Sequence, residues 1–354
     1  MDNENLDGPA PTIQAPVRFA PASQLLIEMS DEHAARLLVR SLVDQVLQLT
    51  APLDAAGPAL PQHPSGWRAA IDRLDTCLAL YSSALDGSVP KKSRRKVRQL
   101  ARRAARVDRR EALVAWLIPF SEAVRSPEHA SDDAVAATWL QRRLADRVDG
   151  VGGSIKNAQR DIAKLQSLDK ALSVYTTSVQ IDDMPRMQSF GALTAELLRD
   201  ESAELARHFD ELELSSVRSM ASLLAATRRI GYLLGPVRVH VPGGTGVSES
   251  VNALQSSLER LAELGGISNA ILRAGKRAGS AHMRAVLTRE LFGTRDGDAS
   301  TSHGDLRRGL VALARVLHAE LSASLQHFRG TWPRESVVGL IQSIADCASL
   351  LRRS

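Results

Sequence analysis

The sequence is poor in aromatic side chains and in cysteine. Only 4% of its 354 residues are Phe, Trp or Tyr, which disfavours an aromatic platform that stacks on single-stranded nucleic acid. Its two cysteines, Cys77 and Cys347, show no CxxC spacing, so we expect buried thiols rather than a disulfide or a metal site. No run of about 18 apolar residues is present, and the N-terminus lacks a basic-then-apolar signal pattern. These absences predict a soluble, cytoplasmic protein with no membrane partner.

Motifs for catalysis and for cofactors are absent as well. The sequence has neither the HExxH pattern of zinc proteases nor the GxSxG turn of hydrolases. The PGGTG stretch at 242–246 lacks the Gly-Lys-Ser/Thr ending of a phosphate loop, so it predicts a connection between helices. Glu204 and His208 share a helix face, but this spacing is more typical of a solvated pair than of half a metal site. We therefore predict no enzymatic activity, no cofactor, no metal site and no catalytic residue.

Positive charge, in contrast, is abundant and local. The stretch KKSRRKVRQLARRAARVDRR (91–110) holds eleven Lys or Arg and one acid, a formal charge of +10, while the whole chain is only +5. Residues 1–60 hold eight acids and three arginines, a net charge of −5. Charge concentrated in one segment indicates an anionic partner rather than general solubility.

Periodicity gives this basic segment a helical face. At about 100° per residue, five arginines fall within an arc of about 80°: Arg95, Arg98, Arg102, Arg106 and Arg109. The small and apolar residues lie opposite: Val97, Leu100, Ala101 and Ala104. This pattern predicts an amphipathic helix with a narrow buried face and a row of guanidinium groups. Because guanidinium is a planar donor fork that matches phosphate oxygens, the row is suited to phosphate.

A second basic set lies in the expected helix 215–235. Arg228, Arg229 and Tyr232 collect on one side of it, opposite Leu223 and Ile230. The Tyr232 hydroxyl is able to donate a hydrogen bond to an anion oxygen. The alternative is a tyrosine packed beneath arginine stems, whose charged ends reach solvent.

Helical spacing covers most of the remaining chain, so the predicted fold class is all-α, built from helical bundles. Residues 1–22 contain four prolines and predict a disordered, mildly acidic leader. VRVHV (237–241) permits one short extended segment, which alone makes no sheet. The expected helices lie near 23–49, 66–85, 93–118, 132–148, 154–179, 187–210, 215–235, 248–264, 267–292, 305–329 and 335–352.

Four segments, taken in order, resemble the CHAD domain, the conserved histidine α-helical domain. They are RAAIDRLDTCLALY (68–81), VRQLARRAARVDR (97–109), RRIGY (228–232) and LQSSLERLAE (254–263). Arg-rich helices are common, and each segment alone is weak, but four in the same order and at similar separations are harder to obtain by chance. The resemblance spans roughly residues 30–290.

The resemblance implies a CHAD-like domain over 23–354, with two pseudo-symmetric helical halves (23–180 and 187–354) around a basic cavity. It also implies binding of inorganic polyphosphate without chemistry and, in some members, association with polyphosphate granules. The candidate polyphosphate-binding residues are Arg68, Arg73, Arg95, Arg98, Arg102, Arg228, Arg229 and Tyr232.

Several positions depart from the family pattern. The family's histidine is Ser65 here, and Asp72 and Asp75 stand where arginine is usual. Because Asp72 lies four residues after Arg68, we expect the two to neutralise each other. These departures, and the +10 charge of residues 91–110, leave two further interpretations beside polyphosphate binding. One is a degenerate helical scaffold for a protein partner. The other is nucleic-acid binding, which the absence of helix-turn-helix and zinc-finger patterns makes less favoured.

Overall fold

The computed structural model describes residues 25–55, 65–122, 131–149, 163–170, 172, 188–211, 217–292 and 303–353. Within these ranges the regular elements are helices, and β pairing is limited to an isolated bridge between Ser30 and Ser189. The predicted all-α class is therefore confirmed. The expected leader 1–22 and most of the expected helix 154–179 lie outside the described residues.

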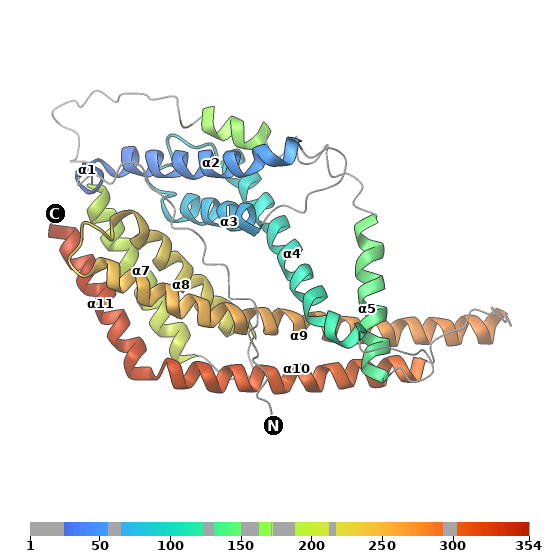
Figure 1. Ribbon diagram of the computed structural model, residues 1–354. Helices are drawn as coiled ribbons and strands as arrows, with labels where there is room; N and C mark the ends of the chain where they lie inside the picture. Colours follow the sequence, from blue (N-terminus) through green and yellow to red (C-terminus); the bar gives the residue numbers. More distant parts are fainter. Residues whose placement is uncertain are drawn as a thin grey trace.

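Figure 1 shows the labelled helices, coloured along the chain from blue to red. Their bounds are α1 Leu25–Glu28, α2 Asp31–Ala55, α3 Ser65–Leu80, α4 Lys91–Glu122, α5 Asp132–Asp149, α7 Phe190–Asp210, α8 Val217–Val237, α9 Gly244–Phe292, α10 His303–Thr331 and α11 Arg334–Arg353. A further helical stretch covers residues 163–170. In Figure 1, α9 and α10 run side by side, and α5 packs on α10.

Helix α9 corrects one prediction. The sequence predicts two helices, 248–264 and 267–292, separated at a Gly-Gly pair, but a single helix runs from Gly244 to Phe292. Leu264, Ile267 and Ile271 are buried on the same face on both sides of the pair. Packing of that face outweighs the cost of about 1 kcal/mol for each glycine inside a helix.

The connection between α8 and α9 corrects another prediction. Residues 238–240 form a turn rather than an extended segment. The Arg238 N–H donates to the Leu234 carbonyl at 2.8 Å, and the His240 N–H donates to the Val237 carbonyl at 2.9 Å. Gly243 then takes a φ of 76°, a left-handed conformation that glycine adopts readily. The PGGTG stretch thus begins as the predicted helix connection and continues into α9.

The apolar interior forms two clusters joined by long helices. The larger cluster holds residues of α2, α3, α7, α8 and α11, together with the first part of α4 and of α9. The smaller cluster is made by the second part of α4, by α5, by the second part of α9 and by the first part of α10. Leu321 of α10 packs against both. Each cluster combines both halves of the sequence, and the pseudo-symmetry of those halves stays a prediction.

The basic helix α4 has the predicted amphipathic form. Its buried residues in the basic stretch are those expected opposite the arginines: Val97, Leu100, Ala101 and Ala104. Farther along, Leu113, Trp116 and Leu117 are buried in the smaller cluster. Helix α4 packs against α3, α5 and α9, which leaves the arginine side of its basic stretch facing solvent.

Candidate functional site

All the predicted site residues except Arg229 fall into two groups, and the first is a cluster of paired charges between helices. Arg68 of α3 is only 7% exposed and forms ion pairs with Asp108 and Glu111 of α4. Its Nη2 lies 2.6 Å from Glu111 Oε2. The expected neutralisation of Arg68 by Asp72 is therefore replaced by contacts between helices. Arg68 joins α3 to α4 and is not presented to solvent.

Arg228 of α8 is paired in the same way. Its Nη2 donates to Glu259 Oε1 of α9 at 2.9 Å, and its Nη1 lies 3.8 Å from Asp72 Oδ2 of α3. Burial raises the pKa of Asp72, while Arg228 and a hydrogen bond from Tyr232 oppose that rise. Three helices thus converge on one guanidinium group.

Tyr232 lies within this cluster as a packing residue. Its ring packs against the larger apolar cluster, and the guanidinium carbon of Arg73 lies 5.3 Å from the ring centroid. Burial raises the pKa of the Tyr232 hydroxyl and lowers that of Arg73. Of the two interpretations of this tyrosine, the geometry favours packing beneath arginines.

Arg98 and Arg102 border the cluster from α4. The Arg98 Nε lies 3.9 Å from Asp75 Oδ1, and the Arg98 side chain is 52% exposed. Burial raises the pKa of Asp75, and the positive charges of Arg98 and then Arg102 oppose the rise. A pair this long and this exposed contributes little to stability. Arg98 and Arg102 are therefore more available to a ligand than Arg68 or Arg228.

The carboxylates of this cluster outnumber its arginines. We call it the arginine–carboxylate cluster and define it by three arginines and four acids, so that its formal net charge is −1. Its members are Arg68, Arg73, Arg228, Asp72, Asp108, Glu111 and Glu259.

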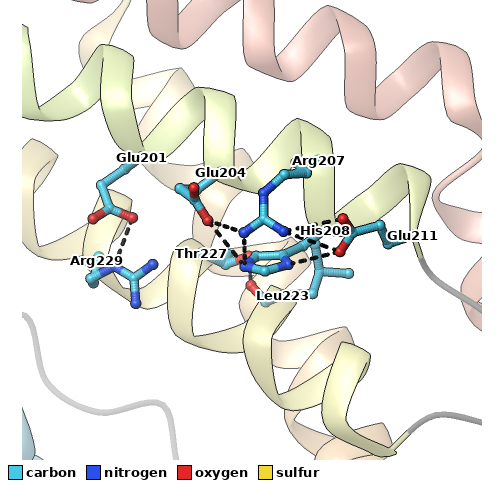
Figure 2. Close-up of polar contacts among 8 residues, drawn as sticks. All are labelled: Glu201, Glu204, Arg207, His208, Glu211, Leu223, Thr227 and Arg229. Carbon is cyan, nitrogen blue, oxygen red and sulfur yellow. Dashed lines mark hydrogen bonds and ion pairs between the residues drawn. The ribbon is translucent and has the colours of Figure 1, made fainter.

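Arg229 lies apart from this cluster, on the α7 side of α8. Its Nε donates to Glu201 Oε2 of α7 at 2.6 Å, as Figure 2 shows. In the same view His208 Nε2 lies 3.3 Å from Glu204 Oε2, so the two share a face as predicted. Arg207 also forms an ion pair with Glu204, so the same carboxylate contacts both side chains. Among the described residues no group of three or more His, Cys, Asp or Glu is placed to hold a metal ion.

The second group of predicted residues lies on the outer face of α4. Cations there are exposed at every turn: Lys91, Arg95, Arg98, Arg102, Arg106 and Arg109. We call this row the α4 track. Within the part of the chain that the structure describes, the side chains of Lys91, Arg95, Arg106 and Arg109 make no hydrogen bond or ion pair.

Two other arginines of α4 serve the fold instead. The Arg94 guanidinium donates to the carbonyls of Ser82, Leu85 and Val89 and binds Asp86 at 2.8 Å, which fixes the turn before the helix. Arg110 donates to the carbonyl oxygen of Leu144 and so ties α4 to α5. Neither belongs to the α4 track.

One open cleft lies elsewhere, where α4, α9 and α10 meet. It has a volume of about 600 Å³, and its walls include Trp116, Phe120, Arg260, Glu263 and Glu320. Trp116 Nε1 donates to Glu320 at 3.1 Å, and Arg260 lies within 3.6 Å of both glutamates. The charged groups of this cleft are thus engaged with one another.

Sequence reasoning missed the glutamates that neutralise Arg68, Arg228 and Arg229. Glu111, Glu201 and Glu259 come from three different helices, and helical spacing places a residue on a face without naming its neighbour. The available signal was the pair of aspartates, Asp72 and Asp75, at positions where the resembled family has arginine.

No protein-family model and no curated protein matches the chain. Among solved structures, the chain is similar to the CHAD domain from the plant Ricinus communis, with a TM-score of 0.51 and 12% sequence identity. The likeness covers 81% of this chain and 93% of that chain. The predicted CHAD-like fold is therefore confirmed as a fold. Among the described helices, none combines the length and the apolar character needed to cross a membrane.

Proposed function

We propose that this protein binds long inorganic polyphosphate, or a similar polyanion, through the exposed cations of α4 and without catalysing a reaction. The observation that carries the proposal is the α4 track, in which Lys91, Arg95, Arg106 and Arg109 are exposed and make no ion pair within the described residues. A protein that neutralises phosphates releases their counterions, so affinity depends mainly on how many cations engage. Arginine also holds phosphate oxygens bidentately.

The CHAD-like fold supports the same ligand as an expectation from resemblance. Members of that family bind polyphosphate, and some associate with polyphosphate granules. We therefore propose the cytoplasm, and polyphosphate granules where a cell forms them, as the location of the protein.

A second candidate function is a helical scaffold for a protein partner that no longer binds polyphosphate. The arginine–carboxylate cluster favours it, because acids already neutralise Arg68 and Arg228. The α4 track favours polyanion binding instead, since Lys91, Arg95, Arg106 and Arg109 have no such partners among the described residues.

The test is a titration of the purified chain with long-chain polyphosphate at low and at physiological salt. Heparin and duplex DNA serve as competitors, because both are polyanions of different geometry. We expect polyphosphate binding to persist at physiological salt and to outcompete both. Binding that is absent, or equal for all three polyanions and erased by salt, would refute the proposal and favour the scaffold.

A further inference from the structure

The α4 track is a straight row with a definite length. Its six cations share one arc of the helix, and successive members are three or four residues apart. From Lys91 to Arg109 the helix rises by about 27 Å, and each step along the row is about 4.5–6 Å. A compact anion therefore reaches one or two neighbouring cations, whereas a linear polyanion of about 27 Å reaches all six.

The track is also rigid at both ends. Arg94 fixes the start of α4 onto the preceding turn, and Arg110 ties its later part to the carbonyl of Leu144 in α5. Val97 and Leu100 anchor the opposite face in the larger apolar cluster. Because the backbone is already ordered, a ligand that lies along it loses little free energy to ordering the helix.

The arginine–carboxylate cluster is a poor place for the same ligand. An entering phosphate chain meets the carboxylates of Asp72, Asp108 and Glu259 as well as the arginines. Like charges in a partly buried site repel strongly, and separating Arg68 from its acids leaves a buried charge unpaired. The excess of acids in this cluster therefore disfavours a polyanion.

Building on the function proposed above, we propose that the α4 track selects extended linear polyanions over compact ones, while the ion pairs of Arg68 and Arg228 in the arginine–carboxylate cluster take no part in binding. The inference concerns the shape of the ligand and the side of α4 that it contacts.

Ligand length tests the first half of this proposal. The full chain is titrated with polyphosphates graded from tripolyphosphate to long chains, each at several salt concentrations. We expect the slope of log K against log salt to steepen with chain length and to level off near about −4 once all six cations are engaged, at about 0.7 for each. The slope is measured rather than the affinity alone because a long chain can bind in many equivalent positions. Those positions raise the apparent affinity but leave the slope unchanged.

Paired variants test the second half. Arg102→Gln with Arg106→Gln removes two track cations, so the slope should fall by about 1.4 and the affinity at physiological salt by about tenfold. Arg307→Gln with Arg308→Gln removes the same charge from exposed positions of α10 and should change neither. Arg228→Gln with Glu259→Gln removes an inner pair and should also leave binding unchanged. Circular dichroism and thermal melting confirm that each variant folds.

Each outcome points to a definite conclusion. If tripolyphosphate gives the same slope as long chains, the binding site is compact, and the proposal that the ligand lies along the α4 track is wrong. If the α10 variant weakens binding as much as the track variant, only overall charge matters. If the Arg228 and Glu259 variant weakens binding, the inner pair takes part. A wild-type chain that binds no polyphosphate refutes the proposed function itself, before any variant is compared.

Discussion

Replacing Arg68 by alanine separates a structural role from a role in binding. Arg68 is 7% exposed and holds two acids of α4, but the side chains of Asp108 and Glu111 are 50% and 34% exposed. Breaking a fully buried ion pair costs about 3–5 kcal/mol, and exposed pairs contribute about 0–1 kcal/mol. Since the acids here regain water while the arginine stem loses its packing, we expect Arg68→Ala to lower the free energy of unfolding by about 2–3 kcal/mol.

Urea unfolding followed by circular dichroism gives this free energy, with an unchanged m-value as the check that the same surface unfolds. Polyphosphate affinity is then measured below the melting temperature, where the variant is folded. Arg95→Ala is the matched control: it should leave stability within about 0.5 kcal/mol and weaken polyphosphate binding. The reverse result, with Arg68→Ala stable but deficient in binding, would refute our assignment and return Arg68 to the ligand site that the family resemblance implies.

Glycines and one acid give further predictions. A Cβ on Gly309 would overlap the carbonyl oxygen of Asp132, whereas a Cβ on Gly266 meets nothing within 4 Å. In thermal melts, Gly309→Ala should destabilise by about 2–3 kcal/mol and Gly266→Ala should stabilise by about 0.5–1 kcal/mol; equal effects would contradict the close approach of α5 and α10. Because burial raises the pKa of Asp75 on folding, its ionisation opposes folding as the pH rises through that pKa. In urea unfolding, Asp75→Asn should keep or raise the free energy of unfolding at pH 7 and change it less at pH 4. The same substitution frees Arg98, so it should strengthen polyphosphate binding; weaker binding would contradict this.

Helical spacing predicted the fold and the α4 track because both depend on which face of a helix is buried. Val97, Leu100 and Ala104 are buried as expected, and the arginines opposite them are exposed. Spacing failed at the Gly-Gly pair of α9, where the local preference of glycine favours a break. Leu264 and Ile267 on either side of the pair are buried, and their packing keeps the helix continuous despite that preference. Such packing partners come from other helices, so the local sequence does not show them.

The arginine–carboxylate cluster shows what helical spacing in the sequence does not predict. Asp72 and Asp75 are visible as departures from the family, but their partners are fixed by helix packing. Asp72 contacts Arg228 of α8 rather than Arg68 of its own helix. Glu259 reaches the same arginine from α9. A helical period relates residues three or four apart, so pairs between helices remain outside its reach.

The acids of the arginine–carboxylate cluster also bear on what a ligand does to the stability of this protein. In a basic cavity without such acids, the arginines would repel one another until a polyanion arrived, and folding would depend strongly on the ligand. Here Asp108 and Glu259 already compensate Arg68 and Arg228. Polyphosphate bound at one site should therefore stabilise the chain by the amount that mass action gives, about 2.7 kcal/mol at a ligand concentration of 100 times Kd. A much larger stabilisation at that ratio would contradict binding at the α4 track alone, because it requires a second site on the folded chain.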